Sequence, residues 1–464
     1  MIPMTLAEVA GVVGGRLADA DPDIVVTVAA SDDRDCAPGT LFACIRGERV
    51  DGHDFIESAR ERGAVACLTT RAVGSPAVVV DDVVAALGVL ASYVIQRLPG
   101  TLVLGLTGSS GKTTTKDLLA AILTPHGETV APRGSFNSEV GLPLTVLSCT
   151  TRTKYLVLEM GMRGRGHIAY LCRIAHPRIA GVINVGSAHI ELLGSREAIA
   201  EAKAEIIDDL PADGTAILHA DNPLVTAQAG RTSAPTITFG EAADADLRAS
   251  DITLDALARP GFTLHWQGSA VPVQLTLSGE HQVANALAAT AFALAAGIDL
   301  ADIVAVLQTY VPASKWRMEI TERADGVTVI NDAYNANPES MRAALKALVA
   351  IGRDQGRRTW AIIGEMREIG DTSVEEHDAI GRLAVRLDVA KLVAVGEGAR
   401  PVHLGAAHEG SWGEESAWVP DVDAAIALLR DEVQPGDVVL VKASRSIGLE
   451  RVAEALLVED GDAA

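Results

Sequence analysis

Residues 105–116, GLTGSSGKTTTK, combine glycines, small hydroxyl side chains and a lysine between two hydrophobic stretches. Backbone N–H groups around Gly108 and Gly111, beside a helix N-terminus, would bind phosphate oxygens. The Lys112 ammonium suits the β- and γ-phosphates of a nucleotide, and the Thr113 hydroxyl suits Mg²⁺. TLVL before the loop favours a strand and DLLAAIL after it a helix. The alternative is a glycine-rich turn with an incidental lysine.

This loop departs from the commonest phosphate-loop pattern, because Leu106 stands where a glycine five residues before Gly111 is expected. The local form is the shorter TGSSGKT (107–113). Kinases, GTPases, motors and ligases share such loops, so this stretch predicts a nucleotide but no reaction. The expected nucleotide-binding residues are Thr107, Gly108, Ser109, Ser110, Gly111, Lys112, Thr113 and Thr114.

Two polar residues follow other hydrophobic runs. Glu159 ends YLVLE, and a carboxylate at a strand end opposite a phosphate loop is a suitable Mg²⁺ ligand. His189 follows the run that ends in NVGSAH. A lone histidine is more often a structural hydrogen-bonding group, and Mg²⁺ prefers oxygen, so the residues by themselves favour the structural role for His189.

Lys203 has an unusual position in SREAIAEAKAEIIDDL (195–210), a predicted helix with Ser195 as its N-cap. Helical spacing places Lys203 on the same face as Ile199 and Ile206. Snorkelling of the ammonium to water is the simpler interpretation and is favoured by spacing alone. Burial would instead lower the lysine pKa and leave a neutral amine, which could add CO₂ to form a carbamate and so become an oxygen donor for a metal.

Two further stretches carry polar groups near strand ends. In INDAYNANPESM (330–341), Asp332 is placed for a ribose or metal contact, and Asn335 and Asn337 for a polar ligand, although a turn rich in Asn and Pro is the alternative. In LVKASRSIGLE (440–450), Lys442 and Arg445 suit an anion or carboxylate, or an ordinary helix entry. Neither stretch names a substrate.

The elements that position these residues form two series. TLVLGLTG, KYLVLEMG, RIAGVINVGSAH and GTAILHA read as buried parallel strands, followed by a helix in EHQVANALAATAFALAAG. VTVINDAYN, TWAIIGEM, KLVAVGEG and DVVLVKASRS alternate with helices near 338–351, 375–388, 421–432 and 447–458. Since ligands of doubly wound sheets bind beyond the strand carboxyl ends, a site between the two sheets is expected.

The bulk properties set limits on function. With 464 residues, the chain is long enough for two or three domains. A net charge of −22 disfavours nucleic acid and anionic membranes as partners. Five scattered cysteines without a CxxC pair fit a reducing cytoplasm. The first residues lack a signal-peptide pattern, and no hydrophobic run is long enough to span a membrane.

Taken together, the motifs resemble the Mur ligase family of ATP-dependent amino-acid ligases. The similarity covers nearly the whole chain and rests on SDDRDCAPGTLFACIRGERVDGHDFIESARERGAVACL (31–68), TGSSGKTTTK, FNSEVGLPLT (136–145), LEMG, NVGSAHIELLGSREAIAEAKAEI, GEHQVANALAA, INDAYNANPESM, IIGEMREIG and LVKASRSIGLE. One stretch departs: MRGRGHI follows EMG, where family members often have an Asn- and His-containing continuation.

The resemblance implies an α/β fold of three domains. Residues 1–99 would form a small α/β substrate domain for a UDP-muramoyl ligand, residues 100–312 a central P-loop ATPase-like domain with a parallel sheet, and residues 313–464 a Rossmann-like doubly wound domain. Pro99-Gly100 and the run YVPASKW are the expected linkers. The third domain is expected to close over ATP.

The resemblance also implies residue roles. Thr113 and Glu159 would bind one Mg²⁺, and His189 and a carbamylated Lys203 a second, with Lys112, His189 and Lys203 as catalytic residues. Nucleotide contacts would include Asn285, Arg317 and Asp332. Substrate contacts would include Ser31, Asp32, Arg34, Asn137, Thr145, Tyr334, Asn335, Asn337, Lys442, Ser444 and Arg445.

Within the family, DAYNANPESM resembles the members that use ATP and Mg²⁺ to join D-alanyl-D-alanine to UDP-N-acetylmuramoyl-tripeptide through an acyl phosphate. Members that add diaminopimelate or lysine resemble it less. The expected protein is a cytoplasmic, monomeric enzyme of peptidoglycan precursor synthesis. Another ligase of the superfamily, including a folylpolyglutamate synthetase-like enzyme, and a P-loop regulatory NTPase are the alternatives. The third residue of the tripeptide, diaminopimelate or lysine, is left open.

Overall fold

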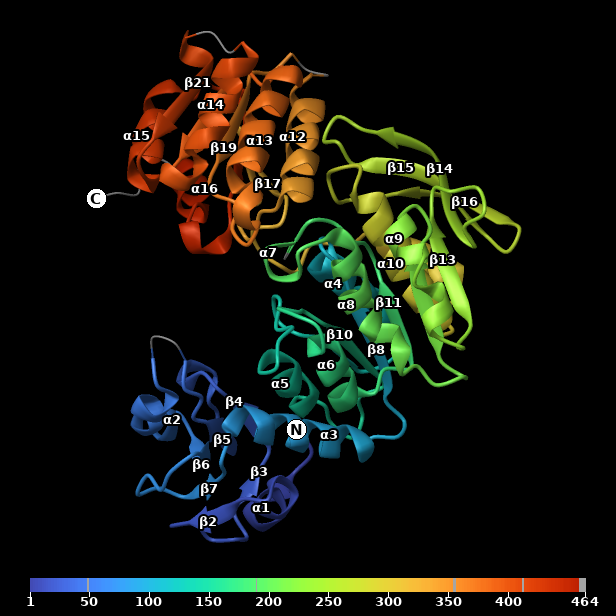
Figure 1. Ribbon diagram of the computed structural model, residues 1–464, viewed down its shortest axis with the longest axis vertical. Coiled ribbons are helices and arrows are strands. Elements are labelled where there is room, and N and C mark those ends of the chain that lie inside the picture. Colours follow the sequence, from blue (N-terminus) through green and yellow to red (C-terminus); the bar gives the residue numbers. More distant parts are fainter. Residues whose placement is uncertain (48–49, 189, 354–355, 411–412, 459–464) are drawn as a thin grey trace.

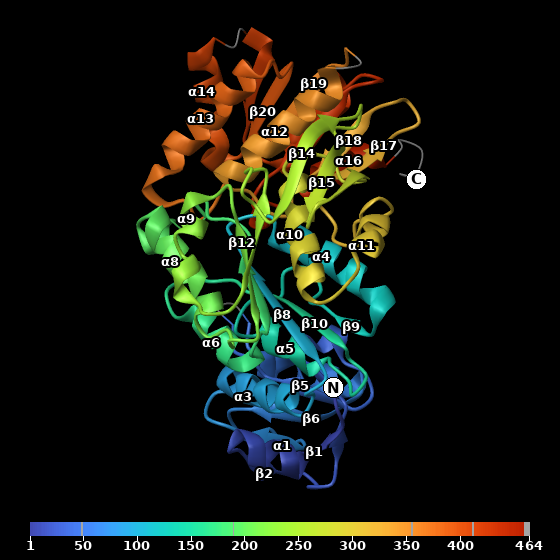
Figure 2. The same ribbon diagram turned by 90° about the vertical axis from the view of Figure 1, so that its right-hand side faces the viewer.

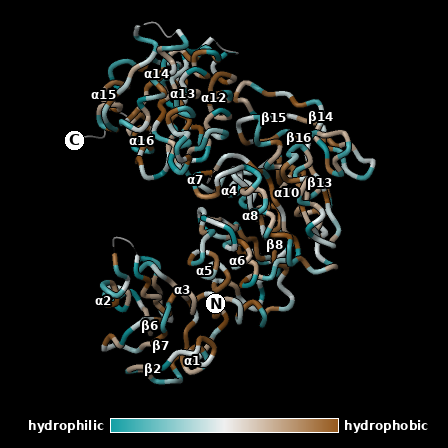
Figure 3. Tube along the Cα trace, viewed as in Figure 1, coloured by the Kyte–Doolittle hydropathy of each residue, from teal (hydrophilic) through white to brown (hydrophobic). Residues whose placement is uncertain are grey.

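The computed structural model describes residues 1–47, 50–188, 190–353, 356–410 and 413–458. Three α/β domains follow one another along the longest axis, with the amino-terminal domain at one end and the carboxy-terminal domain at the other (Figure 1). Among the described residues, no helix is both long enough and hydrophobic enough to cross a membrane. Brown hydrophobic segments run through each domain in Figure 3, and much of the outer trace is teal or white.

The amino-terminal domain is built on a small mixed sheet with strand order β2-β7-β6-β5-β4, next to the pair β1-β3. Its strands are β1 (Met4–Thr5), β2 (Arg16–Ala18), β3 (Val25–Val26), β4 (Val28–Ala30), β5 (Thr40–Ala43), β6 (Ala64–Thr69) and β7 (Ala77–Val79). Its helices are α1 (Leu6–Val13), α2 (Ile56–Glu61) and α3 (Val83–Gln96).

The central domain has the strand order β16-β15-β14-β13-β12-β11-β8-β10-β9. The strands are β8 (Leu102–Thr107), β9 (Thr129–Val130), β10 (Tyr155–Glu159), β11 (Ile179–Val182), β12 (Thr215–His219), β13 (Thr236–Gly240), β14 (Leu247–Leu254), β15 (Pro260–Trp266) and β16 (Ser269–Gln274). The helices are α4 (Lys112–Leu123), α5 (Gly141–Leu147), α6 (His167–Ala175), α7 (Ile190–Leu193), α8 (Arg196–Asp208), α9 (Pro223–Thr226), α10 (Gln282–Ala295) and α11 (Leu300–Leu307).

Helices cover both faces of this sheet. Figure 2 shows α6 and α8 on one side of it and α4, α10 and α11 on the other. The strands β8, β10, β11 and β12 pair in parallel and are largely buried, as their continuous hydrophobic runs predict. The antiparallel hairpins β14–β15 and β15–β16 were not expected from the sequence.

The carboxy-terminal domain is doubly wound, with strand order β17-β18-β22-β19-β20-β21. Its strands are β17 (Glu319–Glu322), β18 (Thr328–Asn331), β19 (Thr359–Ile363), β20 (Lys391–Val395), β21 (Ser416–Val419) and β22 (Val438–Lys442). Its helices are α12 (Pro338–Arg353), α13 (Ser373–Arg386), α14 (Arg400–Glu409), α15 (Val422–Glu432) and α16 (Glu450–Leu457). The antiparallel edge strand β17, β21 and α14 are additions to the series expected from the sequence.

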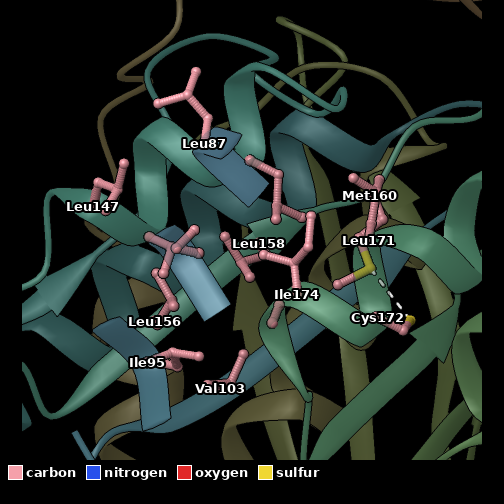
Figure 4. Packing of buried hydrophobic residues seen from close by; sticks show 14 of the residues in the cluster. Leu87, Ile95, Val103, Leu147, Leu156, Leu158, Met160, Leu171, Cys172 and Ile174 are labelled. Atoms are coloured by element: carbon pink, nitrogen blue, oxygen red, sulfur yellow. Dashed lines mark hydrogen bonds between the residues drawn. The ribbon is translucent and has the colours of Figure 1, made fainter. Parts of the chain in front are cut away.

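The domains differ in how they are joined. One continuous hydrophobic cluster runs from the amino-terminal domain into the central domain, because α3 packs against α5 and α6. Figure 4 shows part of it, with Leu87 and Ile95 of α3 among side chains of the central domain such as Leu156 and Ile174. The carboxy-terminal domain has hydrophobic clusters of its own. Among the described residues of the central domain, only Ala258 belongs to one of them.

Candidate active site

The predicted phosphate loop lies between β8 and α4, at the carboxyl edge of the central sheet. Gly111 is the N-cap of α4 and has a φ of 75°, a left-handed conformation that glycine adopts without strain. A Cβ at this position would lie 2.2 Å from Oδ1 of Asn285. The loop therefore requires glycine at 111, and it approaches α10 closely enough to form one wall of a cavity.

Asn184, just after β11, holds the loop in shape. Its Oδ1 accepts hydrogen bonds from the backbone N–H groups of Ser109 at 2.8 Å and Ser110 at 3.0 Å, and its Nδ2 donates to the Ser110 carbonyl at 2.9 Å. This residue was not predicted from the sequence to have a role. Its signal would have been an asparagine at the end of a strand that neighbours the loop-bearing strand.

Glu159 lies beside the loop, because β10 pairs in parallel with β8 and Glu159 is opposite Leu106. The Thr113 hydroxyl donates to Glu159 Oε2 at 2.8 Å, and Asn137 Nδ2 donates to Oε1 at 2.7 Å. A buried carboxylate next to a hydroxyl is an oxygen donor set of the kind that Mg²⁺ takes. No cluster of three or more His, Cys, Asp or Glu side chains suited to a metal occurs within the described residues.

Lys112 and Lys203 both donate to the carbonyl oxygen of Gly108, at 2.7 Å and 3.0 Å. Lys203 is only 1% exposed. Burial, reinforced by the nearby charge of Lys112, holds the pKa of Lys203 well below its usual value. Burial also lowers the pKa of Lys112. The snorkelling interpretation of Lys203 is therefore wrong: α8, capped by Ser195 as expected, buries the ammonium against the phosphate loop.

The phosphate loop and the carboxy-terminal domain together enclose a cavity of about 370 Å³. The predicted residues that line it are Ser109, Ser110, Gly111, Lys112, Thr113, Thr114, Asn137, Glu159, Asn285, Arg317, Asp332, Tyr334, Asn335, Asn337 and Lys442. His281, Gln282 and Glu339 also line it and were assigned no role from the sequence, although GEHQVANALAA and INDAYNANPESM contain them.

Arg317 fits a nucleotide ligand. Its guanidinium stacks 4.2 Å from the centre of the Tyr334 ring, and its buried Nε has no hydrogen-bond partner. A buried donor without a partner is costly, so it is normally satisfied by a ligand or water. The phosphate loop, the oxygen donors of Glu159 and Thr113, and this Nε thus fit a magnesium nucleotide.

Lys442 and Asp332 form a buried ion pair rather than two independent ligand-binding charges. Lys442 Nζ lies 2.6 Å from Asp332 Oδ2 and donates to the Asn335 carbonyl at 2.9 Å. Asp332 Oδ1 accepts from the Met318 backbone N–H at 3.1 Å. The pair therefore also shapes the wall of the cavity.

Several other predicted residues lie outside this cavity. The Thr107 and Thr145 hydroxyls donate to the carbonyls of Met160 and Gly141, and Arg445 stacks on Trp316 and pairs with Glu450. The Ser444 hydroxyl accepts from the Arg367 N–H. Ser31, Asp32 and Arg34 lie in the amino-terminal domain, where the Arg34 guanidinium lowers the pKa of Asp32 to about 2. His189 lies outside the described residues.

A second cavity, of about 520 Å³, lies next to the first. It is lined from the amino-terminal domain by Asp82 and from the central domain by Glu139, Arg163 and Tyr170. Lys112 and Asn137 line both cavities. A group bound in the second cavity can therefore meet a phosphate held in the first. Arg163 belongs to the stretch MRGRGHI (162–168) that departs from the expected pattern.

Known proteins are similar to this chain over nearly its whole length. Family models match residues 30–93 ("Mur ligase family, catalytic domain"), 106–293 ("Mur ligase middle domain") and 316–445 ("Mur ligase, glutamate ligase domain"). The UDP-N-acetylmuramoyl-tripeptide–D-alanyl-D-alanine ligase of Mycobacterium tuberculosis is 47% identical, over 99% of this chain and 99% of that protein.

Solved structures are similar to this chain in fold. A MurF crystal structure from Acinetobacter baumannii has a TM-score of 0.87 and 32% identity, covering 98% of this chain and 99% of that one. A MurF ligase from Thermotoga maritima in complex with ADP has a TM-score of 0.78 and 30% identity, covering 93% and 97%.

Proposed function

The chain belongs to the Mur ligase family, and on this premise we propose that it uses ATP to join D-alanyl-D-alanine to UDP-N-acetylmuramoyl-tripeptide. The single observation that carries the chemistry is the meeting of two cavities at Lys112 and Asn137. One cavity has a phosphate loop, and the other reaches the amino-terminal domain, so a nucleotide and a second substrate can react across Lys112.

The nucleotide would lie in the cavity shared with the carboxy-terminal domain. Its phosphates would be bound by the N–H groups of the loop and by Lys112, and Arg317 would donate through its unpartnered Nε. Glu159 and Thr113 would hold one Mg²⁺, and His189 and Lys203 a second. Such ions, when bound, offset the charge of the transferring phosphoryl group.

A carboxylate is a poor electrophile, so amide formation requires its activation. In the proposed sequence, an oxygen of the tripeptide carboxylate attacks the γ-phosphorus of ATP, giving an acyl phosphate and ADP. The D-alanyl-D-alanine amine then attacks the acyl carbon, loses a proton, and inorganic phosphate leaves. Lys112, positioned between the cavities, stabilises negative charge that develops on the phosphoryl oxygens.

The surroundings of Lys203 support the hypothesis that its amine is carbamylated. Burial to 1% exposure lowers the pKa of Lys203 and so favours its neutral amine, which is the form that adds CO₂. Carbamylation would place an anion next to Lys112, whose ammonium would attract it. The carbamate oxygens would also supply donors of the kind that a metal takes.

The remaining site predictions are part of the same proposal. Tyr334, Asn335 and Asn337 face the nucleotide cavity from the carboxy-terminal domain, where the dipeptide acceptor would approach. Ser31, Asp32 and Arg34 would contact the UDP end. We also propose that the enzyme acts as a monomer, since both cavities are lined by this one chain, and in the cytoplasm, since the cysteines Cys36, Cys44, Cys67, Cys149 and Cys172 are free thiols.

The test is ADP release with UDP-N-acetylmuramoyl-tripeptide and different acceptors. Release that depends on D-alanyl-D-alanine is expected, together with a product larger by that dipeptide in mass spectrometry. Activity with single L-amino acids instead would favour another ligase of the superfamily. Slow ATP hydrolysis that ignores every amine would favour a regulatory NTPase. Tripeptides ending in diaminopimelate and in lysine, compared in parallel, identify the third residue.

A further inference from the structure

Glu339, in the first turn of α12, contacts a central-domain loop that follows β11. The Ser187 backbone N–H donates to Glu339 Oε1 at 2.9 Å, and the Ser187 hydroxyl lies 2.9 Å from Oε1 and 3.0 Å from Oε2. A Cβ at Gly186 would lie 2.9 Å from the same carboxylate. The loop thus has a glycine, Gly186, where Glu339 approaches most closely. The next residue, Ser187, donates to the Glu339 carboxylate through both its backbone N–H and its hydroxyl.

This contact continues to the phosphate loop. The Gly186 backbone N–H donates to Ser109 Oγ at 2.9 Å. From the other direction, Asn337 at the start of α12 makes a long contact of 3.5 Å from its Nδ2 to the Ser109 carbonyl. Ser109 is therefore held from two sides, by the loop that Glu339 binds and by the helix that carries Glu339.

The arrangement depends on the carboxy-terminal domain lying over the central domain, because Glu339 and Ser187 belong to different domains. Within the described part of the chain, Ser187 supplies every hydrogen bond that the Glu339 carboxylate accepts. A half-buried carboxylate bonded to two donors is a charge-assisted contact, which is stronger than a neutral hydrogen bond.

We propose that Glu339 is a positioning residue for the ligase reaction: through Ser187 it couples docking of the carboxy-terminal domain to the shape of the phosphate loop. The inference rests on the proposed function and deepens it. Glu339 lies at the wall of the nucleotide cavity, with its carboxylate bonded to Ser187. It acts when the domains meet, by fixing the 186–187 segment against Ser109 while the phosphoryl group is transferred.

A simpler role for Glu339 is that of a first-turn acid stabilising the α12 dipole. That role predicts that Glu339→Ala lowers the melting temperature, and that the effect of this substitution does not depend on Ser187. Asp423 offers a matched control, because it is a first-turn acid of α15 in the same domain, with a side chain 77% exposed. In Figure 1, α15 lies at the far side of the domain from the interface.

The experiment compares Glu339→Ala, Ser187→Ala, the double variant and Asp423→Ala, by kcat, by KM for ATP and tripeptide, and by melting temperature. Glu339→Ala is expected to lose about tenfold in kcat, the effect of one charge-assisted hydrogen bond, and Ser187→Ala, which keeps the backbone N–H donor, is expected to lose less. KM for the tripeptide and the melting temperature should match those of Asp423→Ala. The double variant should be no slower than Glu339→Ala, since Ser187→Ala removes only part of the contact that Glu339→Ala removes entirely.

Three results would overturn the proposal: multiplicative losses in the double variant, a kcat for Glu339→Ala equal to that of Asp423→Ala, or a kcat loss accompanied by a matching fall in melting temperature. Failure of the proposed function is seen separately, in the wild-type enzyme, as ADP release that does not depend on D-alanyl-D-alanine. In that case the same four variants, assayed with the acceptor that does work, still decide the coupling.

Discussion

Lys112 and Lys203 donate to the same carbonyl oxygen, so two ammonium groups converge on one acceptor at the phosphate loop. Helical spacing placed Lys203 correctly on the apolar face of α8, but it does not reveal what covers that face. The covering surface is the phosphate loop, 95 residues away in sequence. Burial of a lysine therefore depends on tertiary structure, and spacing alone favoured the wrong alternative.

Replacing Lys203 with alanine is expected to lower kcat by about 100-fold or more, because the proposed second metal would lose a ligand near the transferring group. Since the variant has no amine to carbamylate, excess bicarbonate should not restore the rate. The measurement is steady-state ADP release with and without bicarbonate, after circular dichroism confirms folding. Turnover near that of the wild type would remove the carbamate from the mechanism.

Arg317→Ala is expected to weaken ADP binding about tenfold, because the unpartnered Nε is proposed to donate to the nucleotide. Isothermal titration calorimetry with ADP and Mg²⁺ measures this directly. Arg430→Ala serves as control, since Arg430 is exposed on α15. If both variants bind ADP equally well, Arg317 is not a nucleotide ligand.

At the scale of elements, the parallel strands were the most predictable part of the fold. Continuous hydrophobic runs with polar ends correctly predicted the strands β8, β10, β11 and β12, and the strands β18, β19, β20 and β22. The ends of these strands carried Glu159, Lys442 and Asp332 to the site. Asn184 was missed because its role depends on β11 lying next to β8, an adjacency that local sequence does not contain.

Helix α14 shows a second physical limit. Its sequence RPVHLGAAHE buries few large side chains, and its position is set by close packing on α13. A Cβ at Gly381 would lie 1.8 Å from the Val402 carbonyl oxygen, and one at Gly405 would lie 2.2 Å from that of Asp378. These two glycines allow α13 and α14 to approach closely. The sequence of either helix, however, does not show that the two helices pack together.

The loop–helix junction at Gly111 gives a prediction at this scale. Gly111→Ala places a Cβ against Asn285 and requires a left-handed alanine, which costs about 1–2 kcal/mol. Nucleotide affinity should fall by about tenfold or more, as measured by titration with ADP and Mg²⁺. Gly100→Ala, in the linker with open space around its Cβ, should bind normally. Equal affinities would show that the junction tolerates a side chain.

At the scale of the whole molecule, the two domain interfaces differ in chemistry. The amino-terminal and central domains share hydrophobic packing through α3. The carboxy-terminal domain meets the phosphate-loop side through polar contacts, including Ser135 with Tyr334 at 2.5 Å and Ser187 with Glu339. Polar interfaces of this kind open more readily than hydrophobic ones. The carboxy-terminal domain is therefore the part expected to move.

Small-angle X-ray scattering tests this motion. With an ATP analogue and the muramoyl substrate, the radius of gyration is expected to be smaller than that of the ligand-free protein, because ligands shared by both domains hold them together. ADP alone, which lacks the γ-phosphate, serves as the comparison. Identical profiles in all three states would contradict closure.

The shared cluster around α3 has a consequence for how the chain unfolds. Heating cannot melt the amino-terminal domain without exposing Leu87, Ile95 and the central side chains packed on them. The carboxy-terminal domain shares no such hydrophobic cluster with the central domain: among the described central residues, only Ala258 packs in its clusters. Differential scanning calorimetry should accordingly resolve two cooperative transitions rather than three. In thermodynamic terms, three domains make two unfolding units.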